Sequence, residues 1–231
     1  MVRPCLILSA VALFAGCQRP QEDLELYVPS DAIAVAGVHL DQIRSAEWYR
    51  ALAVPENLGG AGYVVAAYNG KDLLFIAKGR SGRPALSGSP AAVRAAEHQR
   101  ATGRTGAPDL LAQARGIMNK PIWVVARGGQ PLPLSGNLAN LNTLLRQTEY
   151  TTVTAGFDSG IDLEAVGLCG NTAAASKLEE TVRGMVTLAS AAAKRDPDLA
   201  SLLRSVQVRR DGATVQVKAS TTVAAVEKLL R

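Results

Sequence analysis

The stretch AIAVAGVHL, residues 32–40, decides the fold of this chain. Its apolar residues occupy both alternating sets of positions, which is typical of a central strand in a sheet. Asp41 follows directly and can cap a helix that runs to about residue 52, before Pro55 ends it. The segment therefore predicts a sheet with strands on both sides of this one.

Hairpin signals recur along the rest of the chain. Asn69-Gly70 and Asp158-Ser159-Gly160 each separate two strand-like segments, and a last hairpin turns at Asp211-Gly212. The other expected strands are 62–68, 72–79, 85–87, 122–126, 150–157 and 161–169. The other expected helices are 89–101, 108–118, 138–145, 172–194, 197–206 and 221–230.

The order of these elements repeats. Both halves, 30–119 and 120–231, read strand, helix, hairpin, helix, and the second half adds a hairpin and a helix. The order suggests a duplicated unit, although the two halves share little residue identity. Because hairpins dominate, we expect an α+β fold with a mostly antiparallel sheet and helices packed on one face.

The N-terminus has the pattern of an export signal. One charged residue, Arg3, precedes the apolar run CLILSAVALF at 5–14, and small residues follow it. The run has about ten residues, whereas a membrane-spanning helix needs about 20. It therefore predicts a cleaved signal and not a membrane span.

The segment Leu13-Phe14-Ala15-Gly16-Cys17 resembles the lipobox of bacterial lipoproteins. The resemblance implies a diacylglyceryl thioether on the Cys17 sulfur, cleavage before Cys17 and acylation, typically with palmitate, of the new amine. It gives a signal peptide at 1–16, a lipidated tether at 17–29 and a globular region at 30–231. The protein would then face the periplasm, anchored to a membrane of the cell envelope through Cys17. Gln18, where an aspartate would favour the inner membrane, favours the outer one.

Further segments resemble uncharacterised lipoproteins of acidobacteria and similar environmental bacteria. The resemblance lies in Val28-Pro29-Ser30-Asp31-Ala32, in Trp48-Tyr49 and in Lys120-Pro121-Ile122-Trp123. It implies an envelope lipoprotein and no particular activity.

Composition limits the partners. Cys5 leaves with the signal and Cys17 carries lipid, so Cys169 is the only free thiol and no internal disulfide can form. The formal charge of +5 suits an envelope protein, anionic lipid or cell wall as partner. Nucleic acid is not expected, because the compartment is wrong and only 4% of residues are aromatic.

No metal or cofactor motif occurs. The two histidines, His39 at a strand end and His98 in a charged helix, have no second ligand at helical or hairpin spacing. The glycine-rich Gly59-Gly60-Ala61-Gly62 precedes a strand, whereas a phosphate-binding loop precedes a helix. We therefore expect no bound cofactor.

Catalytic groups are equally sparse. Cys169 falls on the apolar face of its strand, where a cysteine usually packs as a small hydrophobe. Asp162 and Glu164 share the opposite face, but nothing indicates the cleft that a glycosidase needs between two carboxylates. We expect no catalytic residue.

A basic segment lies at 78–104, opposed only by Glu97. It could meet lipid headgroups or acidic wall polymers, but a solvated loop and helix face explains it more simply. Its members are Lys78, Arg80, Arg83, Arg94, Arg100 and Arg104.

The leading hypothesis is a membrane-anchored, non-enzymatic binding or interaction module. The alternatives are a carrier of lipid or another apolar ligand, and an envelope hydrolase.

Overall fold

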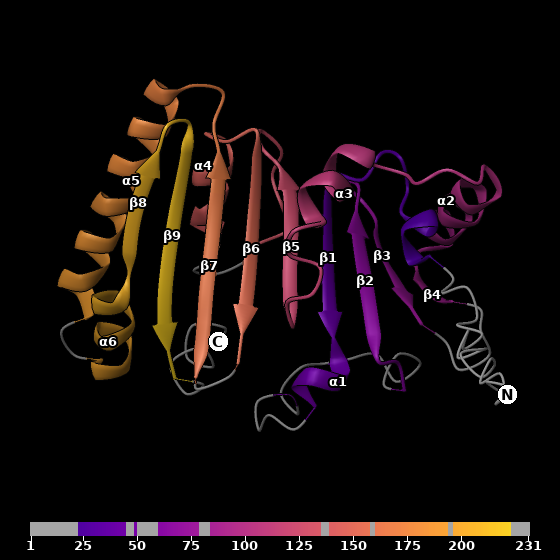
Figure 1. Ribbon diagram of the computed structural model, residues 1–231, viewed down its shortest axis with the longest axis horizontal. Helices are drawn as coiled ribbons and strands as arrows, with labels where there is room; N and C mark the ends of the chain where they lie inside the picture. Colours follow the sequence, from indigo (N-terminus) through magenta and orange to yellow (C-terminus); the bar gives the residue numbers. More distant parts are fainter. Residues whose placement is uncertain are drawn as a thin grey trace, which may run out of the picture.

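One sheet organises the residues that the structure describes, which are 23–44, 49, 60–78, 84–134, 139–157, 160–193 and 196–222. In this computed structural model, nine antiparallel strands lie in the order β4-β3-β2-β1-β5-β6-β7-β9-β8 (Figure 1). The expected α+β class with an antiparallel sheet is confirmed. The strands are β1 (Ala34–His39), β2 (Tyr63–Tyr68), β3 (Leu73–Ala77), β4 (Ala85–Gly88), β5 (Ile122–Arg127), β6 (Tyr150–Gly156), β7 (Ile161–Leu168), β8 (Gln207–Asp211) and β9 (Thr214–Thr221).

Side-chain caps set the starts of the longer helices. Ser89 Oγ accepts a hydrogen bond from the backbone N–H of Ala92 at 3.1 Å, and Pro90 occupies the first helical position. Asn171 and Asp196 cap their helices in the same way. The helices are the 3₁₀ helix η1 (Leu24–Tyr27), α1 (Leu40–Ile43), α2 (Pro90–Ala101), α3 (Pro108–Ala114), α4 (Leu141–Leu145), α5 (Thr172–Ala192) and α6 (Pro197–Ser205).

β1 lies inside the sheet between β2 and β5, as its sequence predicted. Gly37 is paired with Val65 on one side and Trp123 on the other. Because Gly37 has no side chain, the indole of Trp123 lies across it, where a Cβ would overlap the ring. Trp123 Nε1 then donates to the Tyr63 hydroxyl on β2 at 3.2 Å. One fully buried aromatic residue thus joins three strands.

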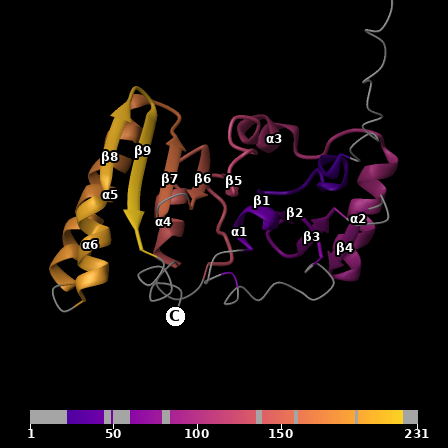
Figure 2. The same ribbon diagram turned by 60° about the horizontal axis from the view of Figure 1, so that its bottom comes forward.

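The helices cover opposite faces of the two halves of the sheet. Val35, Val65 and Trp123 pack under α2, α3 and η1, whereas Val215 and Cys169 pack under α5. Cross-strand pairing puts these two sets on opposite faces. Ala36 points to the face opposite to its neighbour Val35, and directly paired residues share a face. Successive pairs link Ala36 to Val217, which packs beneath α5, through Val124, Val153 and Ala165. Figure 2 shows α3 and α4 on different sides of the sheet. The helices therefore do not all lie on one face of the sheet as expected, and in the first half α1 packs with Val38 and Val64 on the face opposite to η1, α2 and α3.

The two halves share only part of their architecture. The order β1, α1, β2, β3 corresponds to β5, α4, β6, β7, and α1 and α4 pack on the same face. The first half then inserts β4 before its long helix, whereas β7 leads directly into α5. The extra strand reverses the chain once more, and the later helices of the two halves end on opposite faces.

The folded region begins earlier than residue 30. Leu24 is 7% exposed and Val28 is fully buried, and both belong to the core beneath α2 and α3. The expected tether at 17–29 therefore overlaps η1, because two apolar residues hidden among polar ones anchor this segment. Residues 17–22, with the predicted lipid site Cys17, lie outside the described residues, as does the signal at 1–16.

Some expected boundaries shift. The helix expected at 108–118 ends at Ala114 and continues as turns, with the Ile117 N–H bonded to the Ala114 carbonyl at 2.8 Å. The helix expected at 221–230 lies outside the described residues, except that Thr221 ends β9. Most of the helix expected at 41–52 also lies outside them.

A bidentate ion pair fixes α3 to the sheet. Arg127 Nε and Nη2 each donate to the Asp109 carboxylate at 2.7 Å, and the Tyr150 hydroxyl donates to it at 3.1 Å. Chiefly because of the Arg127 hydrogen bonds, the pKa of Asp109 falls to about 2. The charged form of Asp109 therefore stabilises the fold.

We expect Asp109→Asn to lower the free energy of unfolding at pH 7 by about 1–2 kcal/mol. A pKa shift of this size implies at most roughly 2.5 kcal/mol, and partial exposure of both side chains screens the pair. The stabilisation exists above the unfolded pKa near 4 and is lost as the pH falls through about 2. Denaturant unfolding from pH 7 to pH 2 should therefore show the two proteins converging in acid. A constant difference over that range would contradict the assignment.

Candidate functional site

A groove of about 500 Å³ opens where β1 ends and β2 begins. We call it the His39 groove. Segments distant in sequence converge on it: η1, the β1–α1 junction, β2, the end of β3 and the turn after α3. Its lining residues are Asp23, Leu24, Glu25, His39, Asp41, Gln42, Gly62, Tyr63, Val65, Lys78 and Met118.

A stacked aromatic pair forms part of the groove. The rings of His39 and Tyr63, paired across β1 and β2, have centroids 4.3 Å apart and an interplanar angle of 24°. His39 Nε2 lies 2.7 Å from the Met118 carbonyl oxygen, so this nitrogen carries the proton and donates it. Trp123 donates to the Tyr63 hydroxyl from behind. Backbone and core therefore fix both rings before any ligand arrives.

Carboxylates line much of the remaining wall. Asp23 and Glu25 come from η1, and Asp41 comes from the first turn of α1. Asp41 pairs with Arg44 at 3.4 Å, and Arg44 also donates to the Ala61 carbonyl at 2.5 Å. Lys78 supplies the ammonium among the lining residues. The groove thus combines aromatic, acidic and apolar surfaces.

Burial alters the ionisation of two of these groups. Burial raises the pKa of Tyr63 to about 12, and Glu25 adds to the shift. Burial first, and Asp23 second, raises the pKa of Glu25 above its ordinary value. Tyr63 thus stays protonated at neutral pH, which suits hydrogen bonding to a ligand better than proton transfer.

Cys169 packs as predicted. It is 3% exposed and lies with Leu178 and Val215 beneath α5. Burial, and then Glu149, raises the pKa of its thiol, which disfavours the reactive thiolate. Cys169 lies in a different hydrophobic cluster from the groove, and its described neighbours in that cluster are apolar.

The other candidate residues are dispersed. His39 ends β1 and His98 is exposed on α2, both as expected. Asp162 and Glu164 share a strand face, but Ser220 donates to Asp162 at 2.6 Å and Gln216 donates to Glu164. These carboxylates are therefore held in cross-strand contacts on β7 and β9.

The basic segment does not gather into one site in the described part of the chain. Lys78 lines the His39 groove, whereas Arg94 and Arg104 are exposed on α2 and just after it. Arg80 and Arg83 lie outside the described residues. Sequence reasoning missed Glu25 and Tyr63 as groove residues, because no local spacing links them to His39.

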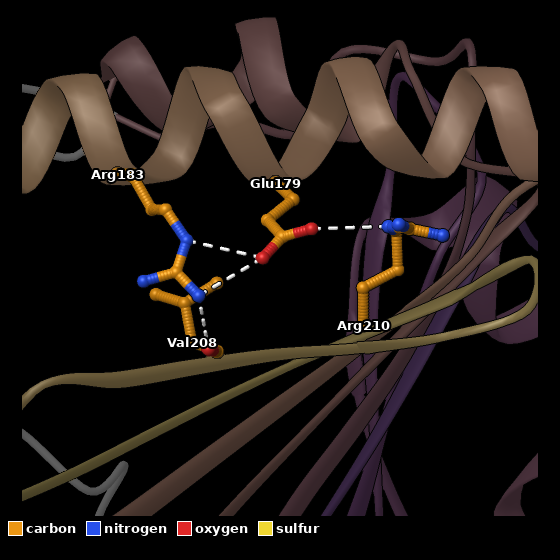
Figure 3. Close-up of polar contacts among 4 residues, drawn as sticks. All are labelled: Glu179, Arg183, Val208 and Arg210. Carbon is orange, nitrogen blue, oxygen red and sulfur yellow. Dashed lines mark hydrogen bonds and ion pairs between the residues drawn. The ribbon is translucent and has the colours of Figure 1, made fainter.

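A second hollow, of about 740 Å³, follows the edge strand β8 and includes Arg209. Its polar residues act as a clamp between α5 and β8 (Figure 3). Glu179 accepts from Arg183 Nη2 at 2.9 Å and from Arg210 Nε at 3.0 Å, while Arg183 also donates to the Val208 carbonyl at 2.7 Å. The clamp thus occupies one backbone acceptor of the edge strand β8.

Glu179→Gln should lower the melting temperature by a few degrees at neutral pH and low salt, because the two arginines lose their counter-charge. Arg183, and then Arg210, lowers the pKa of Glu179, so this contribution is present above the ordinary glutamate range and disappears below it. Thermal unfolding in 0.05 and 1 M salt should show the difference shrinking with salt. Glu180→Gln, at the adjacent exposed position, is the control. Equal effects of the two changes would contradict the clamp.

Comparison with known proteins gives no functional assignment. No family model matches the chain, and no significant match was found among curated proteins or solved structures. Within the described ranges, no three His, Cys, Asp or Glu side chains are grouped to hold a metal ion. No described helix combines the length and apolar character needed to cross a membrane.

Proposed function

We propose that this protein is a lipid-anchored, non-enzymatic binding module of the cell envelope, with the His39 groove as its ligand site. The groove is the observation that carries the proposal. Its volume of about 500 Å³ falls within the range of roughly 300–1,000 Å³ that small-molecule sites occupy. Its aromatic pair is held in place by the Met118 carbonyl and Trp123, so binding needs little reorganisation.

The groove is better suited to binding than to catalysis. His39 uses Nε2 in a backbone hydrogen bond, and the raised pKa of Tyr63 makes it a poor proton donor or acceptor at neutral pH. Among the described lining residues there is no serine, threonine or cysteine to act as a nucleophile.

The predicted anchor would keep this site near a bilayer. Asp23 lines the groove and follows Cys17 by six residues. Six extended residues span at most about 20 Å. Acyl chains on Cys17 would therefore place the groove close to the membrane surface, on the periplasmic side, and Gln18 favours the outer membrane.

Two measurements on protein gently extracted from its native membranes test the proposal. Mass spectrometry of the N-terminal peptide should find an acylated Cys17 as the first residue. Native mass spectrometry should find a small molecule that co-purifies with the protein and with His98→Ala, but is lost from His39→Ala. A different or unacylated N-terminus would overturn the proposal. It would also be overturned if the two variants retained the same bound fraction, or if no protein carried a bound molecule.

A further inference from the structure

We propose that the His39 groove selects a ligand that carries an organic ammonium group. This inference rests on the proposed function, in which the groove is the ligand site, and it adds the chemical class of the ligand. Among the described lining residues, Asp23, Glu25 and Asp41 supply three carboxylates and Lys78 supplies one ammonium. The whole chain, in contrast, has a formal charge of +5. The groove is thus an acidic site on a basic protein.

Among the described residues, two of the carboxylates have no ion-pair partner. Asp41 is paired with Arg44. Within the described residues, neither Asp23 nor Glu25 forms an ion pair, and Glu25 is half-buried. Arg115 lowers the pKa of Glu25, but burial and Asp23 together raise it above its ordinary value. A half-buried carboxylate without a counter-ion is unfavourable, and a bound cation would relieve that cost.

The aromatic pair suits an organic cation. The face of a tyrosine ring attracts an ammonium group within about 6 Å of its centroid. Tyr63 lines the groove beside Glu25, whose charge contributes to the raised pKa of Tyr63. A metal ion fits less well, because the described carboxylates are not grouped closely enough to chelate one. The amine could be a small soluble molecule or a lipid headgroup, and the short predicted tether makes both accessible.

The test is calorimetric titration of the purified full-length protein in a non-ionic detergent. The probes are ethanolamine, the neutral ethylene glycol, and micelles doped with phosphatidylethanolamine or phosphatidylglycerol. We expect ethanolamine to bind and ethylene glycol not to bind. Binding to the phosphatidylethanolamine micelles would identify a headgroup as the source, whereas binding to free ethanolamine alone would identify a soluble amine.

Charge-neutral variants locate the site. Glu25→Gln and Asp23→Asn should each weaken ethanolamine binding at least tenfold, whereas Glu97→Gln, on the exposed face of α2, should leave it unchanged. Glu25→Gln should not lower the melting temperature, because it removes an unpaired, half-buried charge. The inference is overturned if ethylene glycol binds as well as ethanolamine, if ethanolamine does not bind, or if the groove variants match Glu97→Gln. These binding results do not bear on the acylation of Cys17, which is measured separately and tests the anchor.

Discussion

Gly37→Ala is expected to destabilise the protein by about 3–5 kcal/mol. A Cβ at this position would overlap the indole of Trp123, which is fully buried and packed on all sides. The ring cannot rotate away without losing its hydrogen bond to Tyr63 and its core contacts, so the cost approaches that of removing a buried aromatic side chain. Guanidinium unfolding followed by circular dichroism measures the change.

Two further variants define the cause. Gly184→Ala, in α5, meets no atom within 4 Å and should raise stability by about 0.5–1 kcal/mol, because alanine favours the helix. In a Trp123→Val background, Gly37→Ala should cost at least about 1 kcal/mol less than in the native protein, which is the signature of direct contact. A Gly37→Ala protein within 0.5 kcal/mol of the native one would refute this account.

The strand positions could be read from the sequence because their signals are local. Residues 32–40 are apolar on both alternations, and β1 is indeed flanked by strands on both sides. The turns at Asn69-Gly70 and Asp211-Gly212 place glycines at φ 97° and 54°, conformations that other residues rarely adopt.

The placement of the helices could not be read in the same way. β1 and β5 carry apolar residues on both faces, so the sequence does not say which face a helix covers. In the first half α2 follows β4, a four-residue strand without clear alternation, so the sequence gives no sign of the face that α2 covers. Similarly, η1 joins the core through Leu24 and Val28, two apolar residues in a polar segment.

The groove illustrates why the site was harder to predict than the fold. His39 was correctly expected at a strand end, but Met118, whose carbonyl oxygen accepts a hydrogen bond from its ring, is 79 residues away. Glu25 lies in a segment predicted to be tether, and Tyr63 belongs to another strand. Their proximity depends on the order β2-β1-β5 and on the turn after α3, and neither can be deduced from residue spacing.

Cys17→Ser is expected to abolish acylation of the protein. The predicted thioether needs the Cys17 sulfur, and a serine oxygen does not replace it in this modification. Incorporation of labelled palmitate should fall at least tenfold, and the N-terminal peptide should carry no glycerolipid. Each buried CH₂ contributes roughly 0.8 kcal/mol, so losing the acyl chains removes the interaction that would hold the protein on the bilayer.

Cys5→Ser is the matched control, since this cysteine lies in the expected signal and would be removed with it. It should leave palmitate incorporation and the mature N-terminus unchanged. Far-ultraviolet circular dichroism should be the same for both variants and the native protein, because Cys5 and Cys17 precede the first described core residue, Leu24. Palmitate incorporation that survives Cys17→Ser, or that Cys5→Ser abolishes, would remove the anchor. The groove would then have to be explained without a nearby bilayer, and a soluble amine would replace the lipid headgroup as the ligand to test first.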